Sequence, residues 1–118
     1  MTNNSPILVR FANEFEKELY RLSKKYRNIR KDVEPIIDQL QEGGLLGDRL
    51  SGFPADLYIS KVRVKNSNIQ KGKSAGYRLI YLVESATSIL LLTIYSKSER
   101  SDITGDEIQV ILDDFYSS

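Results

Sequence analysis

Apolar residues recur at spacings of three and four in two parts of the first half of the chain. The first set is Phe11, Phe15, Leu19, Leu22 and Tyr26, and the second is Val33, Ile36, Ile37 and Leu40. This spacing places each set on one face of an α-helix. We therefore predict two helices, the second over about residues 29–42. Because few residues join them, they should form an antiparallel hairpin that packs on a sheet.

The ends of these helices carry local signals. Asn13 is a favourable N-cap residue, and Glu16 stands three positions later, at the spacing of a capping box. The glycine pair at 43–44 predicts the end of the second helix. Pro35 lacks a backbone N–H and clashes with the preceding helical turn. The second helix therefore either begins at Asp32, with Pro35 in its first turn, or is kinked.

Other segments have strand or loop character. A short strand is predicted over residues 6–11, and the glycines and prolines of residues 43–55 predict a loop. Residues 76–84 and 87–95 are strongly apolar. Both are predicted strands, and residues 87–95 are apolar on both faces, which is typical of an interior strand covered by helices.

A further strand, over about residues 57–65, alternates strictly from Lys61 onward. Val62 and Val64 face one way, and the cations Lys61, Arg63 and Lys65 face the other. Lysines on a solvated edge strand would explain one or two of these charges. Three of them on one face, with more cations following, favour a binding surface.

A last helix is predicted to follow Thr104, with Glu107 at the capping-box position. The element order is then β-α-α-β-β-β-α. This order predicts an α+β fold in which a mostly antiparallel, curved sheet packs against the N-terminal helical hairpin. Its last three strands should form a meander, and residues 1–118 should form a single domain.

Composition narrows the chemistry. The chain contains no Cys and no His, which excludes a thiolate nucleophile, a Cys-ligated zinc site and the commonest general acid or base. We see no signal-peptide pattern, and the longest apolar run, residues 89–94, is too short for a membrane helix. We expect a soluble cytoplasmic protein that contacts no membrane and needs no cofactor.

Charge is unevenly distributed although the net charge is +1. Residues 57–83 contain six Lys or Arg and no Asp or Glu. If Lys61, Arg63, Arg78 and Lys97 converge on one sheet face, they would hold a phosphate well, because guanidinium groups match its oxygens. Arg78 lies on an otherwise apolar strand whose neighbours offer no carboxylate, which favours an anionic ligand.

A nucleotide-binding P-loop and a two-metal nuclease both fit the sequence less well. Gly72, Lys73 and Ser74 match the end of a P-loop, but Ser67 stands where that motif requires its first glycine. The carboxylates of the last helix could suggest a two-metal nuclease. A solvated acidic face explains them better, and we predict no metal site.

Two segments, 73–81 (KSAGYRLIY) and 94–103 (IYSKSERSDI), together with the element order, resemble the RelE/HigB-type toxins of the RelE/ParE superfamily. The resemblance implies a bacterial type II toxin that cuts mRNA in the ribosomal A site without a metal and is inhibited by a cognate antitoxin. Lys61 and Arg63 match the family's paired basic residues, and Arg78 matches the arginine of its GYR segment. These residues would bind and polarise the scissile phosphate.

The charge pattern and the resemblance together make Lys61, Arg63, Arg78 and Lys97 the predicted catalytic residues. The predicted RNA contacts are Lys65, Lys71, Lys73, Tyr95 and Arg100.

The chain departs from the family pattern at two positions. Ser98 and Thr104 stand where such enzymes often have Arg and Tyr. The general base therefore stays open between Lys97, Lys61 and Tyr95, and Tyr95 could instead stack on a base. A ParE-like toxin that poisons gyrase is the alternative function, and a nucleic-acid-binding module without activity is a third. The four cations together favour the ribonuclease.

Overall fold

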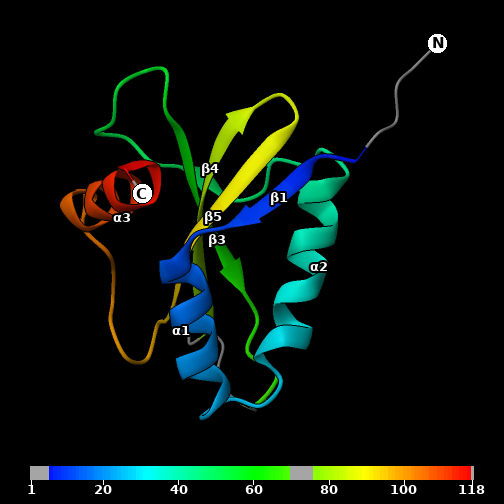
Figure 1. Ribbon diagram of the computed structural model, residues 1–118. Coiled ribbons are helices and arrows are strands. Elements are labelled where there is room, and N and C mark those ends of the chain that lie inside the picture. The colour runs from blue at the N-terminus through cyan, green and yellow to red at the C-terminus, as the bar shows by residue number, and fades with distance from the viewer. Residues whose placement is uncertain (1–5, 70–75, 118) are drawn as a thin grey trace.

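The computed structural model describes residues 6–69 and 76–117 (Figure 1). Its elements in chain order are β1 (Leu8–Phe11), α1 (Asn13–Ser23), α2 (Ile29–Gln41), β2 (Asp48–Arg49), β3 (Tyr58–Val64), β4 (Tyr77–Ser85), β5 (Ser88–Ser96) and α3 (Gly105–Ser117). The predicted order is confirmed except for β2. This two-residue strand lies in the segment that we predicted to be a loop, and it is too short to show any alternation.

The strands form one sheet in the order β1-β5-β4-β3-β2. β1 pairs with β5 in parallel, and the other neighbours are antiparallel. The predicted mostly antiparallel sheet and its β3-β4-β5 meander are therefore confirmed. β5 lies in the sheet interior and is almost wholly buried, as its uninterrupted apolar sequence predicted.

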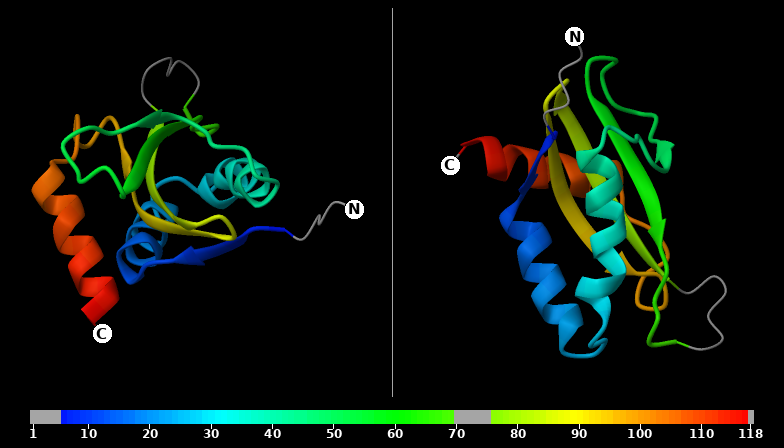
Figure 2. Two further views of the ribbon diagram at one scale, coloured as in Figure 1. Left: turned by 90° about the horizontal axis from the view of Figure 1, so that it is seen from above. Right: turned by 90° about the vertical axis from the view of Figure 1, so that its right-hand side faces the viewer.

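Helices cover both faces of the sheet (Figure 2). The α1–α2 hairpin buries Phe15, Leu22 and Val33 against one face. On the other face, α3 buries Ile108 and Leu112. Strand alternation sends successive side chains into these two cores in turn, so β3, β4 and β5 each contribute to both.

The two predicted capping boxes have different outcomes. Thr104 caps α3 as predicted, because the Glu107 N–H donates to its Oγ1 at 3.1 Å and its own N–H donates to Glu107 Oε1 at 2.9 Å. The cap predicted at Asn13 is wrong. Ala12 takes that position, since its N–H pairs with Leu91 in the sheet and its carbonyl accepts the first helical bond. Asn13 is already inside the helix.

Pro35 lies inside α2, which begins at Ile29. A start at Asp32 is therefore wrong. The helix ends where the glycine pair predicted, and Gly43 adopts the left-handed conformation, with φ of +96°.

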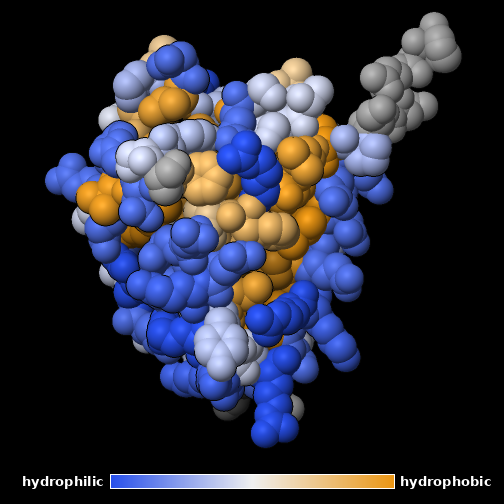
Figure 3. All heavy atoms as spheres, viewed as in Figure 1, coloured by the Kyte–Doolittle hydropathy of each residue, from blue (hydrophilic) through white to orange (hydrophobic). Residues whose placement is uncertain are grey.

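The face seen in Figure 1 has hydrophobic residues between α3 and β1 and hydrophilic residues over α1 (Figure 3). At the β1 edge, Leu8 is 59% exposed and Phe11 is 40% exposed. Within the two described segments, no helix is both long enough and apolar enough to cross a membrane.

Candidate functional site

The sheet face beneath α3 changes from apolar to cationic along the strands. Ile59 on β3 and Ile80 on β4 pack in the core under α3. Further along the same face, β3 presents Lys61 and Arg63, and β4 presents Arg78. Arg63, Arg78 and Tyr95 lie side by side in register on β3, β4 and β5. The cations therefore lie on the same sheet face as the core residues under α3, beyond the end of that core.

A pocket of about 260 Å³ lies at this end of the sheet. Its walls include all four predicted catalytic cations, together with two carboxylates and a serine: Lys61, Arg63, Arg78, Lys97, Asp48, Asp102 and Ser101. Lys97 reaches the pocket because it follows the last residue of β5 and its N–H still pairs with Gly76 at 2.9 Å. The structure thus brings the four cations together from β3, β4 and the exit of β5.

Arg78 is the most deeply placed of these cations, at 8% exposure. Within residues 6–69 and 76–117, its guanidinium makes one hydrogen bond, to the carbonyl oxygen of Tyr77 at 3.2 Å, and no ion pair. Arg63, a like charge, stands directly opposite it on β3. Both features cost stability in a protein without a ligand, so the arrangement suits an anion bound in the pocket.

Lys61 differs from Arg78 because it has a carboxylate partner. Its Nζ lies 3.0 Å from Asp102 Oδ1. The same oxygen accepts hydrogen bonds from Tyr95 Oη at 3.3 Å and from the Ile103 N–H at 2.8 Å. These contacts, led by the one from Lys61, lower the pKa of Asp102. The acid-free stretch of sequence around the cations therefore does not produce an acid-free pocket.

Tyr95 is buried, at 4% exposure, and its hydroxyl reaches Asp102 in the pocket wall. Burial, with a smaller contribution from Asp102, raises its pKa to about 12. Its phenol therefore stays protonated at neutral pH and is a poor general base. Arg100 lies 5.5 Å from the centre of its ring, so in this conformation the ring offers little free surface for stacking on a base.

The remaining predicted RNA contacts lie outside the pocket. Arg100 makes a bidentate contact with Glu107, at 2.7 and 2.9 Å, which ties the segment after β5 to α3. Lys65 is exposed just beyond the end of β3. Lys71 and Lys73 lie outside the described residues, and so does the segment that matches the end of a P-loop.

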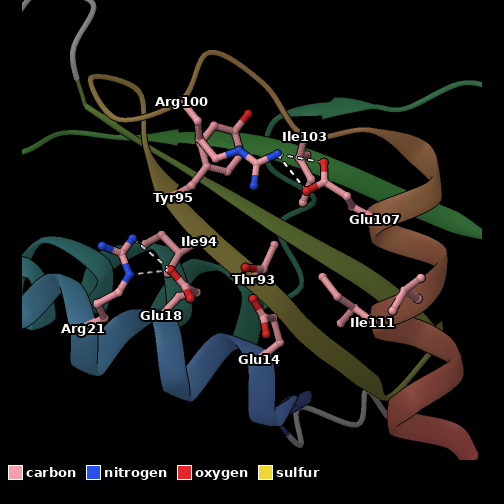
Figure 4. A pocket seen from close by; sticks show the side chains of 11 residues that line it. Glu14, Glu18, Arg21, Thr93, Ile94, Tyr95, Arg100, Ile103, Glu107 and Ile111 are labelled. Carbon is pink, nitrogen blue, oxygen red and sulfur yellow. Dashed lines mark hydrogen bonds and ion pairs between the residues drawn. The ribbon is translucent and has the colours of Figure 1, made fainter.

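A larger hollow of about 370 Å³ lies between α1 and α3 over β5 (Figure 4). It is lined in part by arginines, but both are neutralised. Arg21 pairs with Glu18 at 2.9 Å and also with Glu99, and Arg100 pairs with Glu107. The smaller pocket is therefore the better candidate for an anion, because Arg78 there has no such partner among the described residues.

The two positions that depart from the family pattern have local roles. Thr104 caps α3, and the Ser98 hydroxyl lies 2.9 Å from Ser96 Oγ and 3.4 Å from the Tyr26 hydroxyl. Sequence reasoning missed Asp102 and Asp48 as pocket residues. Asp102 lies in the quoted segment 94–103, but nothing in its spacing indicates that it meets Lys61. No group of three or more His, Cys, Asp or Glu suited to a metal ion occurs in the part of the chain that the structure describes.

The fold and pocket define an α+β protein with a pocket lined by four cations at one end of its sheet. No protein-family model matches the sequence, and no curated protein matches it significantly. Among solved structures, the chain is similar to a double arginine-to-alanine mutant of the E. coli toxin RelE in the free state. The two share 19% sequence identity with a TM-score of 0.51, over 89% of this chain and 92% of that chain. The chain therefore has the RelE fold.

Proposed function

We propose that this protein is a RelE-type toxin of a type II toxin–antitoxin system, a metal-independent endoribonuclease that cuts mRNA at the ribosomal A site in the cytoplasm. A cognate antitoxin would inhibit it. The observation that carries the proposal is the pocket in which four cations meet, with Arg78 buried and lacking a carboxylate partner among the described residues. The RelE fold and the resemblance to RelE/HigB-type toxins support the same assignment.

RNA supplies its own nucleophile for this reaction. The 2′-oxygen attacks phosphorus, the bond from phosphorus to the 5′-oxygen breaks, and the products end in a 2′,3′-cyclic phosphate and a 5′-hydroxyl. Arg78 and Arg63 would hold the non-bridging oxygens, whose negative charge grows in the transition state. Pre-arranged donors of this kind are worth about 10²–10³-fold in rate each.

Proton transfer needs a donor for the 5′-oxygen and an acceptor for the 2′-hydroxyl proton. We assign the donor to Lys97, since its ammonium lines the pocket and makes no ion pair within the described segments. Tyr95 is too weak an acid and Lys61 is held by Asp102. The 2′-hydroxyl proton would pass to water at the pocket mouth.

The test is a map of RNA 5′ ends in bacterial cells after brief induction of the protein. Wild type should produce new cuts inside translated frames. Arg78→Lys keeps the charge but loses the guanidinium fork, and it should reduce these cuts about 10²-fold or more. Arg49→Lys is the matched control, because Arg49 lies outside the pocket and bonds to the carbonyl oxygens of Ala55 and Leu57. It should cut like wild type.

Other outcomes would overturn the proposal. Growth arrest with intact mRNA would favour the gyrase-poisoning alternative. Equal cutting by wild type and Arg78→Lys would remove Arg78 from the site, and neither arrest nor cutting would leave a binding module.

A further inference from the structure

Asp102 stands out because it is an acid placed among the cations that are proposed to hold phosphate. Its Oδ1 accepts three hydrogen bonds, from Lys61 Nζ, Tyr95 Oη and the Ile103 N–H. Of the other nearby acids, Glu99 pairs with Arg21 and Glu107 pairs with Arg100. Asp48 lies opposite Lys61 across β2 and β3 but makes no ion pair with it. Among the described residues, Asp102 is thus the acid that pairs with a cation of the pocket.

The Lys61–Asp102 pair is open to solvent. The side chain of Asp102 is 64% exposed and that of Lys61 is 29% exposed. Ion pairs this accessible contribute little to stability, so a stronger anion can displace one partner at low cost. A phosphate entering the pocket would meet Lys61 on the side that Asp102 now occupies.

The segment that carries Asp102 is fastened by contacts that do not need its carboxylate. Arg100 Nε donates to the backbone oxygen of Asp102 at 2.9 Å and its guanidinium pairs with Glu107. The N–H groups of Glu99 and Arg100 donate to the carbonyl oxygen of Ser96. Loss of the carboxylate should therefore leave the segment in place, and the Asp102→Asn variant should fold.

We propose that Asp102 is a built-in counter-ion of the pocket, which occupies Lys61 in the free protein and competes with RNA phosphate for it. This inference rests on the proposed function of the pocket. Asp102 then sets the affinity for RNA: the free protein holds RNA weakly, and Lys61 becomes available only where other contacts keep the phosphate in the pocket.

Binding of a 2′-O-methyl oligoribonucleotide, which cannot be cleaved, tests this competition. Asp102→Asn should bind it about tenfold more tightly than wild type at low salt, the size expected for one unit charge a few ångströms from the ligand at a partly exposed site. Asp48→Asn is the matched control. It removes the same charge from the same pocket, but Asp48 makes no ion pair with Lys61, so its gain should be smaller. Asp102→Glu should retain near wild-type affinity.

A double-mutant cycle separates competition from a general charge effect. Lys61→Gln should weaken binding less than twofold in wild type, where Asp102 occupies the lysine. In the Asp102→Asn background it should weaken binding about tenfold. Equal effects of Lys61→Gln in the two backgrounds, or unchanged or weaker binding by Asp102→Asn, would overturn the inference.

An Arg78→Ala variant separates failure of the inference about Asp102 from failure of the proposed RNA site. If it loses oligonucleotide binding while Asp102→Asn shows no gain, the inference about Asp102 fails and the proposed site stands. If Arg78→Ala and wild type bind equally, the pocket is not the RNA site, and both proposals fail.

Discussion

Arg78 is the residue at which stability and the proposed function oppose each other. It is 92% buried, has no carboxylate partner among the described residues and faces Arg63 across the strand pair. A buried guanidinium of this kind costs stability until an anion neutralises it. The sequence already indicated this isolation, because the strand around Arg78 is apolar and its neighbours carry no acids.

We predict that Arg78→Met abolishes RNA cleavage without lowering stability. Replacing the unpaired charge by an apolar side chain of similar length should leave the free energy of unfolding unchanged or raise it by about 1 kcal/mol. Urea unfolding at neutral pH measures this. Arg63→Met is the control, since Arg63 is exposed, and it should change stability by less than about 0.5 kcal/mol. A loss above about 2 kcal/mol in Arg78→Met would show that the arginine is structural.

Helix ends show how element boundaries depend on their surroundings. Asn13 and Thr104 stand at the same spacing from a glutamate, but only Thr104 caps its helix. The chain enters α1 directly from a sheet hydrogen bond at Ala12, which moves the boundary back by one residue. α3 follows an irregular segment, so its local capping signal decides where it begins.

The two positions give a matched pair of variants. Thr104→Ala should lower the free energy of unfolding by about 1 kcal/mol, because the N–H of Glu107 loses its acceptor. Asn13→Ala should change it by less than about 0.5 kcal/mol, since alanine is a good helix former and no cap is lost. Thermal or urea unfolding of both variants tests this. Similar losses in both would mean that Asn13 does cap α1.

The segment between β5 and α3 should respond to acid. Lys61 lowers the pKa of Asp102 below its ordinary value of 3.8, so the carboxylate stabilises the fold above that pH. This contribution should fade as the pH falls through the lowered value. Because Asp102 is largely exposed, we expect it to be under about 1 kcal/mol.

Urea unfolding of wild type and Asp102→Asn across pH 7 to 2 measures this contribution. The difference in stability between the two proteins should be present at neutral pH and vanish in acid. A difference that is independent of pH would contradict the role of the Lys61 contact.

At the scale of the whole molecule, positive charge is concentrated in one pocket and is nearly balanced by acids elsewhere. The net charge is +1, so long-range attraction to RNA should be weak, and affinity should come from the pocket. With Lys61 occupied by Asp102, three cations remain for phosphate, and they predict a slope of about −2 for the logarithm of the RNA-binding constant against the logarithm of salt concentration, at about −0.7 per contact.

Binding of the 2′-O-methyl oligoribonucleotide over a range of salt concentrations measures this slope. Lys97→Gln should reduce its size by about 0.7, because one contact is lost. Lys17→Gln, which changes an exposed lysine paired with Glu14 on α1, should leave the slope unchanged. A wild-type slope near zero would contradict binding through the cationic pocket.

The sequence by itself determined the order of the long elements, the hairpin, the interior strand and the alternation that places Lys61 and Arg63 on one face. These features follow from spacings within a few residues, which fix the side of a helix or strand that each residue occupies. The short strand β2 and the start of α1 escaped prediction because both depend on pairing with distant parts of the chain.

Only the tertiary structure decided which charges meet. The register of β3, β4 and β5 brings Arg63 beside Arg78, and the path of the chain after β5 carries Lys97 and Asp102 to the same pocket. The same path leaves Arg100 bound to Glu107, outside the pocket. Contacts between residues some 40 positions apart, such as Lys61 and Asp102, depend on strand register and on the path of that segment, and no local spacing encodes either.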